Sequence, residues 1–413
     1  MGIGADSAVW IQVDCMRDLK LPIHSGWVYA TRMALVLAWG LLGFSSAAQD
    51  AVRSLADSGQ QSLGPNQSYS HGNPAPAEQL LLEFINRARL NPVGEADRFG
   101  IDLNEGLPPQ TISATPKAPL AFNAHLLEAS HQHVQWMLDT DVFSHIGQGG
   151  SGVWDRMQSA GYLFPASGSC SENLAWKGYL GGLDFIVCVT AIHQSLFSDT
   201  TVAGRGHRLS LLSEAYQETG AAVRQDLFKG LNSVVIVEDF AATGTDPTPS
   251  LLGVVYADQD RNGFYSVGEG LAGVLVMPSD GLYYATTSAS GGYAIPLTIK
   301  GGAISVIVSG GPLARPITKT VAFTGRNLKL DFSPTTDPPS NPPVRLGAPH
   351  VLSGEQVGFY VRGACGQRVV LQSSDDFVRW SCRQTNGMTG LDQEWVDPAA
   401  RSKPQQFYRA LVE

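Results

Sequence analysis

Three titratable side chains lie where expected helices meet loops in the first half of the chain. His145 ends the run DTDVFSH, Glu172 lies in CSENLAW, and His207 lies in AGRGHRLSLL. Rigid neighbouring elements could hold such side chains in one cleft. Two neutral imidazoles and a carboxylate can bind zinc or another transition metal. Alternatively, Glu172 orients one histidine and fixes its tautomer, or each residue is only a satisfied polar group.

Other polar residues nearby are weaker candidates. His131 and His133 are two residues apart on an expected helix, so they face different directions and are not expected to share a metal. Ser144 and Ser171 each neighbour a candidate residue, but no GxSxG turn frames either serine. We therefore do not expect a serine nucleophile.

A second group of candidates lies in the run DQDRNGFYSVGE at residues 258–269, which fits the pattern D-x-[DN]-x-[DN]-G-x5-E. The expected calcium ligands are Asp258, Asp260, Asn262, Phe264 through its carbonyl, Ser266 and Glu269. Hard oxygen ligands in a loop of this length are typical of Ca²⁺. The flanking runs GVVYA and GLAGVLV are strand-like, so a helix–loop–helix hand is not expected. The alternative is an acidic turn that holds no ion.

Shifts in composition divide the chain into the segments that must position these residues. The expected segments are a signal peptide at 1–48, a flexible linker at 49–76, a first domain at 77–243, a β-rich domain at 250–332, a proline-rich linker at 333–343 and a C-terminal β module at 344–413. The first domain mixes amphipathic helical patterns with strand-like runs, which favours a layered α/β fold. The last two contain short apolar runs broken by turn residues, which favours all-β sandwiches.

The apolar run MALVLAWGLLGF at residues 33–44, preceded by an arginine and followed by small residues, is typical of a secretory signal. We therefore expect a secreted, extracellular protein. One cysteine would leave with the leader, and an even number in an exported chain favours disulfides. The expected local pairs are Cys170 with Cys188 and Cys365 with Cys382. The alternative is buried thiols.

The overall composition excludes several classes of protein. The chain has 413 residues, of which 43% are hydrophobic and 16% charged, so it can form real cores and is not wholly disordered. The net charge is −9 and the sequence lacks a run of Lys and Arg, so nucleic acid is not an expected partner. The apolar runs are shorter than the 18 or so residues of a membrane span, so no span is expected.

Several motifs of residues 77–243 together resemble those of the CAP superfamily, which contains cysteine-rich secretory proteins, venom allergens, plant pathogenesis-related proteins and bacterial relatives. They occur in the order LLLEFINRARLNP, FSH, SENLAW and GRGHRLSLLSEAYQETGAAV, and the stretch IHQSLFSDTTVAGRGHR is most similar to a bacterial subgroup. The resemblance implies an α-β-α sandwich with a shallow central cleft.

The family cleft carries two histidines and two glutamates, and the resemblance maps three of them onto His145, Glu172 and His207. The fourth is a Glu three residues after a Trp, but the corresponding stretch here is IHQSLF. His193 stands near the position of that Trp, and Asp199 is the nearest later acid. The cleft predicted by resemblance is therefore incomplete.

Members of this superfamily mostly lack an established catalytic activity, and several bind lipids, sterols or other proteins. The resemblance therefore implies that the cleft binds a metal such as Zn²⁺, a small apolar ligand or an extracellular protein. One alternative is a metal-dependent hydrolase, with His145 and His207 as ligands and Glu172 as general base. Another is a purely adhesive or structural extracellular protein.

The run GVVYADQDRNGFYSVGEGLAGVLV resembles the B-type, prealbumin-like β-sandwich repeats of bacterial surface adhesins. Those repeats carry a DxDxNG…GE loop between their first two strands. The resemblance implies a calcium-stabilised spacer or stalk at residues 250–332.

Overall fold

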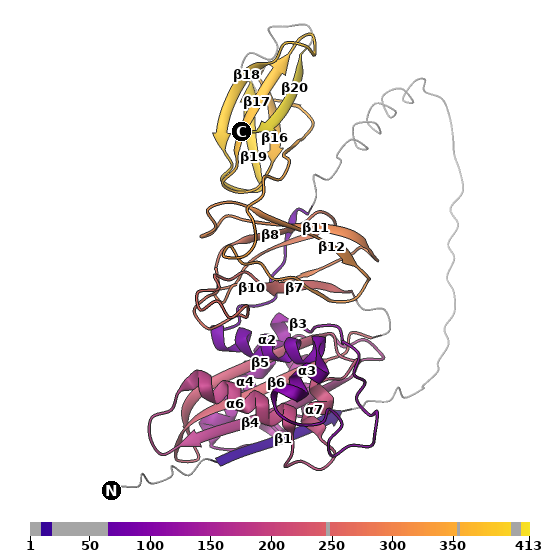
Figure 1. Ribbon diagram of the computed structural model, residues 1–413, viewed down its shortest axis with the longest axis vertical. Coiled ribbons are helices and arrows are strands. Elements are labelled where there is room, and N and C mark those ends of the chain that lie inside the picture. The colour runs from indigo at the N-terminus through magenta and orange to yellow at the C-terminus, as the bar shows by residue number, and fades with distance from the viewer. Residues whose placement is uncertain (1–9, 19–64, 245–247, 353–355, 398–405) are drawn as a thin grey trace, which may run out of the picture.

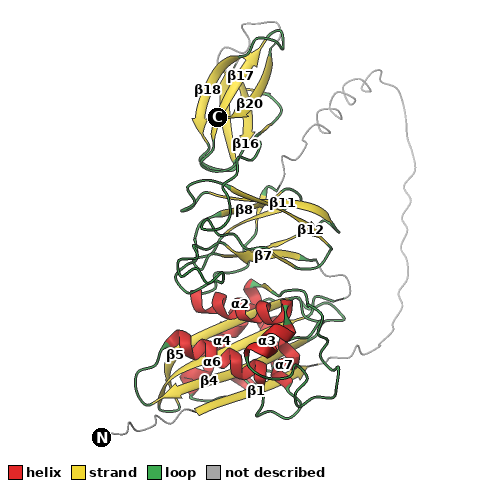
Figure 2. Ribbon diagram, in the orientation of Figure 1, coloured by secondary structure: helices red, strands yellow, loops and turns green. Residues whose placement is uncertain are grey.

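The computed structural model describes residues 10–18, 65–244, 248–352, 356–397 and 406–413 (Figure 1). Three domains follow one another along the long axis of the molecule, with the first domain at one end and the C-terminal domain at the other. The helices gather in the first domain, whereas the later two consist of strands and loops (Figure 2). No helix in the described part of the chain is long and apolar enough to cross a membrane.

The first domain is built around a five-stranded sheet in the order β1-β4-β6-β5-β3. Its strands are β1 (Trp10–Asp18), β3 (Ala121–Phe122), β4 (Cys170–Tyr179), β5 (Glu218–Phe228) and β6 (Leu231–Ala241). Neighbouring strands are antiparallel except β3, which runs parallel to β5. Lys229 and Gly230 join β5 to β6 with positive φ at both residues, as a two-residue hairpin turn requires.

Helices cover both faces of this sheet. They are α2 (Pro76–Leu90), α3 (Pro92–Arg98), α4 (Ala124–Thr140), α5 (Val153–Ser159), α6 (Phe185–Ser198) and α7 (Gly206–Leu211). Because side chains alternate along a strand, Leu174 and Trp176 of β4 pack with α4, whereas Ala175 packs with α2 and α6. The expected α-β-α sandwich is confirmed.

The apolar core of the predicted signal peptide, residues 33–44, lies outside the described residues. The described part of that segment is β1, which pairs in antiparallel register with β4 from Trp10 opposite Gly178 to Asp18 opposite Cys170. The edge of the first-domain sheet is therefore formed by a segment that we expect to leave with the leader.

The predicted disulfides are not formed, because no two cysteines in the described part of the chain lie at bonding distance. Cys170 starts β4 and packs with α4 and α5, whereas Cys188 lies on α6 and packs on the opposite face of the sheet. The sheet thus separates the first pair. Cys365 is half-buried in a loop, and Cys382 is exposed on a strand of the C-terminal domain. Closeness in sequence was a poor guide to the pairing of these residues.

The second domain contains two sheets, in the orders β10-β7-β13 and β12-β11-β8-β9-β2. The strands are β2 (Gln67–Ser68), β7 (Ser250–Val254), β8 (Leu275–Pro278), β9 (Tyr283–Thr286), β10 (Gly292–Pro296), β11 (Gly302–Ser309), β12 (Ile317–Phe323) and β13 (Leu328–Lys329). Leu251 and Ile295 of one sheet share a buried core with Val276 and Val306 of the other. The expected β-sandwich is confirmed.

The described part of the expected flexible linker, residues 65–76, is ordered against the second domain. β2 pairs parallel to β9, and the Tyr69 ring packs edge-on to that of Tyr283. The polar composition of the segment predicted a tether, but its main chain completes a sheet.

The first and second domains share an interface. Phe264 stacks on Phe84 of α2 at a centroid distance of 5.7 Å, and the Arg87 guanidinium lies over both rings. Lys329 is buried between the domains, where it pairs with Glu83 of α2 at 2.8 Å and also with Asp331. The second domain is thus held to α2 by aromatic stacking and by a buried ion pair.

The C-terminal domain contains two further small sheets, in the orders β14-β16-β15, with β19 beside β16, and β18-β17-β20. The strands are β14 (Arg345–Leu346), β15 (His350–Val351), β16 (Val357–Arg362), β17 (Arg368–Ser374), β18 (Ser381–Gly387), β19 (Asp392–Asp397) and β20 (Phe407–Val412). Phe359 and Trp395 form its core with Val369 and Leu371. An all-β C-terminal domain was expected.

Candidate functional site

Glu172 is the centre of a buried polar cluster on the face of the sheet that α4 and α5 cover. Its Oε1 accepts a hydrogen bond of 2.6 Å from Nδ1 of His145, and its Oε2 one of 2.5 Å from Arg156 of α5. Arg156 also donates to the carbonyl of His145. Burial would raise the pKa of Glu172, but the His145 hydrogen bond and the Arg156 charge lower it overall. An ionised carboxylate only accepts, so Nδ1 of His145 carries the proton.

Asp239 lies directly opposite Glu172 in the pairing of β4 with β6. Its burial and the neighbouring Glu172 carboxylate raise the pKa of Asp239 well above its usual value, and Ser130 of α4 donates to its Oδ2. Burial also lowers the pKa of His133 to about 4, so this imidazole is neutral. The cluster therefore holds one carboxylate balanced by Arg156, beside a carboxyl group that keeps its proton.

His207 lies at the start of α7, on the opposite face of the sheet. Its Nδ1 donates to Oδ1 of Asp199 at 2.7 Å, and its backbone N–H donates to Oδ2 at 2.9 Å. Asp199 can do this because it caps the end of α6 in the left-handed conformation, with φ 50°, and turns its fully buried carboxylate toward α7. The carboxylate fixes the tautomer of His207 and leaves the Nε2 lone pair available as a ligand.

Further buried polar groups share this second face. Asn173 donates to Glu238 Oε2 at 3.0 Å, and burial raises the pKa of Glu238 to about 7 against the effect of that hydrogen bond. Four fully buried atoms here find no hydrogen-bond partner among the described residues, namely Ser171 Oγ, Asn173 Oδ1, His207 Nε2 and Glu238 Oε1. Buried polar atoms are normally satisfied, so this set points to a bound water, ion or ligand.

The structure thus distributes the sequence-predicted residues over two faces. His145 and Glu172 are in direct contact, whereas His207 lies on the other side of β4. Side chains 172 and 173 point to opposite faces, and Asn173 donates to the backbone carbonyl of His207 at 3.4 Å. The two imidazole–carboxylate pairs therefore flank the same short stretch of β4.

His193 does not belong to the cleft, which corrects our expectation. Its Nε2 is 3.0 Å from Oε1 of Glu95 on α3, and its ring packs against Phe84 and Phe99. It lies on the buried face of α6, which packs against α2 and β4. His193 is a core residue whose Nε2 is hydrogen-bonded to Glu95, while its Nδ1 finds no partner among the described residues.

Several of the buried polar residues around the two histidine–carboxylate pairs could not be found from the sequence. No motif in the sequence marks Arg156 or Glu238, Asp239 lies inside a largely apolar run, and Asp199 is marked only as the nearest acid after IHQSLF. The run VVIVED offers one usable signal, because two adjacent acids, Glu238 and Asp239, follow four apolar residues within one strand. Placing them on opposite faces needed the strand register.

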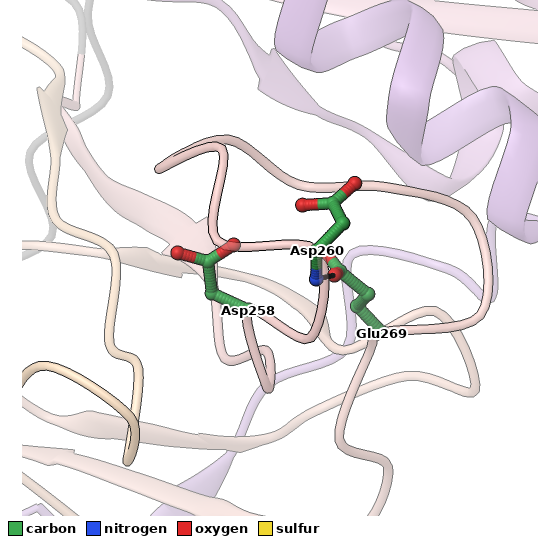
Figure 3. Close-up of side chains that lie close together, drawn as sticks. All are labelled: Asp258, Asp260 and Glu269. Carbon is green, nitrogen blue, oxygen red and sulfur yellow. Dashed lines mark hydrogen bonds between the residues drawn. The ribbon is translucent and has the colours of Figure 1, made fainter.

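The acidic loop, residues 258–269, forms a compact turn in the second domain (Figure 3). Carboxylate oxygens of Asp258, Asp260 and Glu269 lie within 4.8 Å of one another. Backbone amides already orient them, since Gly263 donates to Asp258 at 3.2 Å, and Gln259 donates to Glu269 at 2.7 Å. Oxygens gathered in this way could hold a hard cation.

The remaining predicted ligands are also in this loop. Ser266 Oγ and Asn262 Nδ2 both donate to Asp260 Oδ2, at 2.9 and 2.8 Å. Gly263 has φ 71°, the left-handed conformation that the sharp turn requires. The Phe264 ring points to the first domain, where it stacks on Phe84.

The comparison with protein families agrees with this architecture. The first domain is an α-β-α sandwich with one histidine–carboxylate pair on each side of β4. The sequence model of CAP, the cysteine-rich secretory protein family, matches residues 82–236, so this part of the chain is a CAP domain. No curated protein sequence matches the chain.

One solved structure, of a protein from Bacteroides uniformis described as a candidate carbohydrate-binding protein, is similar over 40% of this chain and 80% of that chain. The identity is 14% and the TM-score 0.16. A similarity of that size supports no argument about fold or function.

Proposed function

We propose that this protein is exported and that its CAP domain binds a divalent transition metal such as Zn²⁺ through His207 Nε2. The proposal is supported by two observations: Asp199 fixes the tautomer of His207 and leaves Nε2 without a partner in the described part of the chain, and three other unpartnered polar atoms lie on the same buried face of the sheet. Imidazoles whose second nitrogen binds a carboxylate are typical metal ligands. The polar surroundings favour a metal over a small apolar molecule.

The surroundings of Glu172 favour binding over hydrolysis. A general base must take up a proton, and the lowered pKa of Glu172 opposes this. Its two oxygens are also engaged, by His145 and by Arg156. Glu172 is therefore suited to orienting His145 and not to accepting a proton during a reaction.

Calorimetric titration of the full chain with Zn²⁺ tests the metal proposal. We expect one site whose affinity falls at least about 100-fold in His207→Ala and about 10- to 100-fold in Asp199→Asn. His125→Ala is the matched control, because His125 is exposed and its Nδ1 bonds only a backbone carbonyl of the same domain. Equal Zn²⁺ binding by His207→Ala and the control would refute the proposal.

We further propose that the acidic loop binds Ca²⁺ and stiffens the second domain as a stalk. The three clustered carboxylates, which repel one another, support this proposal. Titration with Ca²⁺ should show one site, and Glu269→Gln should abolish it because a principal ligand loses its charge. Zn²⁺ binding should be unchanged in that variant. A chain that takes up no Ca²⁺ at millimolar concentration would contradict the stalk proposal.

A further inference from the structure

The outer edge of β4 is the most unusual surface of the first domain. The inner edge of β4 pairs with β6, and its outer edge pairs over nine residues with β1. Residues from Cys170 to Trp176 are all buried. If β1 were absent, the outer edge of β4 would present a row of unpaired backbone N–H and C=O groups over this length.

The covering strand comes from a distant part of the chain. β1 contacts α5, which covers one face of the sheet, and α6 and α7, which cover the other, so it lies between the two helical layers. Its middle, Cys15 and Met16, is in register with Asn173 and Glu172. A strand at this place therefore passes between the His145 pair and the His207 pair.

We infer that the outer edge of β4 is a binding site for an extended polypeptide, which adds as an antiparallel strand between α5 and α7. Residues 10–18 occupy the site in cis, and a segment of a partner protein occupies it once those residues have left with the leader. Main-chain hydrogen bonds supply the affinity in this mode of recognition. The inference goes beyond metal binding, since it depends on the backbone of β4 and not on an imidazole.

Hydrogen exchange on the full chain tests the first half of the inference. The variant Val13→Pro/Asp14→Pro removes two adjacent N–H groups, and alternate residues of an antiparallel strand donate to the partner, so at least one bond is lost. We expect amides of β4 to exchange at least about 100-fold faster in this variant, while β5 and β6 remain protected. Val13→Ala/Asp14→Ala keeps the N–H groups and should retain slow exchange.

Addition of a peptide in trans tests the second half. The probe is a synthetic peptide of residues 10–18 with Cys15→Ser, added to the proline variant of the chain. It should restore protection of β4, and the same peptide carrying both prolines should bind at least about tenfold more weakly. Peptide binding should be the same in EDTA and in excess Zn²⁺, so that failure of one proposal is distinguishable from failure of the other.

Four results would overturn the inference. The first is slow exchange of β4 in a proline variant that stays monomeric, and the second is a peptide that restores no protection or whose proline form binds equally well. A third is dimerisation of the variant with β4 protected, which would assign the edge to a second copy. The fourth is loss of protection in β5 and β6 as well, which would make residues 10–18 a fixed part of the sheet.

Discussion

The two polar clusters of this molecule are built in opposite ways. The groups beside β4 come from segments far apart in sequence, between Ser130 and Asp239, and are buried within a packed domain. The acidic loop takes its groups from twelve consecutive residues, and Asp260 is exposed. The difference shows that one cluster depends on tertiary packing, whereas the other is formed locally.

The charges are also balanced differently. Beside β4, Arg156 neutralises Glu172, and the raised pKa of Asp239 keeps that group protonated. In the described part of the chain, no Lys or Arg pairs with the carboxylates of the acidic loop, which accept mainly from backbone amides. The Glu172 side of β4 is therefore balanced in charge by Arg156, whereas the acidic loop would gain most from a bound cation.

Arg156→Met should have the largest effect on stability. It leaves the Glu172 carboxylate buried without its cationic partner, and breaking a buried pair costs about 3–5 kcal/mol. Urea unfolding followed by exchange of the first-domain amides measures the loss. Arg98→Met is the control, because that side chain is 55% exposed and its pair with Glu95 spans 3.4 Å, so about 1 kcal/mol or less is expected. Equal losses in the two variants would show that burial of the pair is unimportant.

Calcium should stabilise the second domain by about 2.7 kcal/mol when its concentration is 100-fold above the dissociation constant. Asp258→Asn should abolish this gain, whereas Asp280→Asn, at an exposed position outside the loop, should retain it. Scanning calorimetry in EDTA and in excess Ca²⁺ measures both. A gain that survives in Asp258→Asn would place the ion elsewhere.

The pH dependence of unfolding should report Glu238. Its pKa is raised to about 7 in the folded protein, so the folded state binds a proton that the unfolded state has released above about pH 4.5. The stabilisation from this group is full below pH 4.5 and is lost as the pH rises through 7. The difference in free energy of unfolding between Glu238→Gln and the wild type should therefore change between pH 4.5 and pH 8. The change should be about 1–3 kcal/mol in favour of the variant at pH 8. Parallel stability curves for both proteins would contradict the assignment.

Reducing agent should have the smallest effect, because the described cysteines form no disulfide. Dithiothreitol at roughly 10 mM should change the free energy of unfolding by less than about 0.5 kcal/mol. Removal of a native disulfide would instead cost about 2–5 kcal/mol. A loss of about 2–5 kcal/mol on reduction would instead support the disulfides predicted from the sequence.

The fold was predictable where local patterns decide it. The periodicity of α2 and α4 and the apolar run of β6 predict the layers, and the order of the motifs identifies the CAP domain. The acidic loop could be read from sequence because all its groups lie within one turn. The pairing of β2 with β9 could not be predicted, because main-chain hydrogen bonds require no particular side chains in a polar segment.

The candidate site was less predictable because a single step along a strand decides which face a group occupies. Glu172 and Asn173 are neighbours in sequence, yet one joins His145 and the other lies beside Glu238. Asp199 reaches His207 only through the left-handed turn that ends α6. Such choices depend on register and backbone conformation, which spacing alone does not determine.

The path of residues 65–76 has a mechanical consequence. Arg362 of the C-terminal domain binds the carbonyl of Pro65, and the chain then runs along the second domain through β2 before it enters α2 (Figure 1). A pulling force applied at Pro65 and at the C-terminal strand would be borne across the junction between the two β domains. The CAP domain would remain at the unloaded tip while the two β domains are under tension.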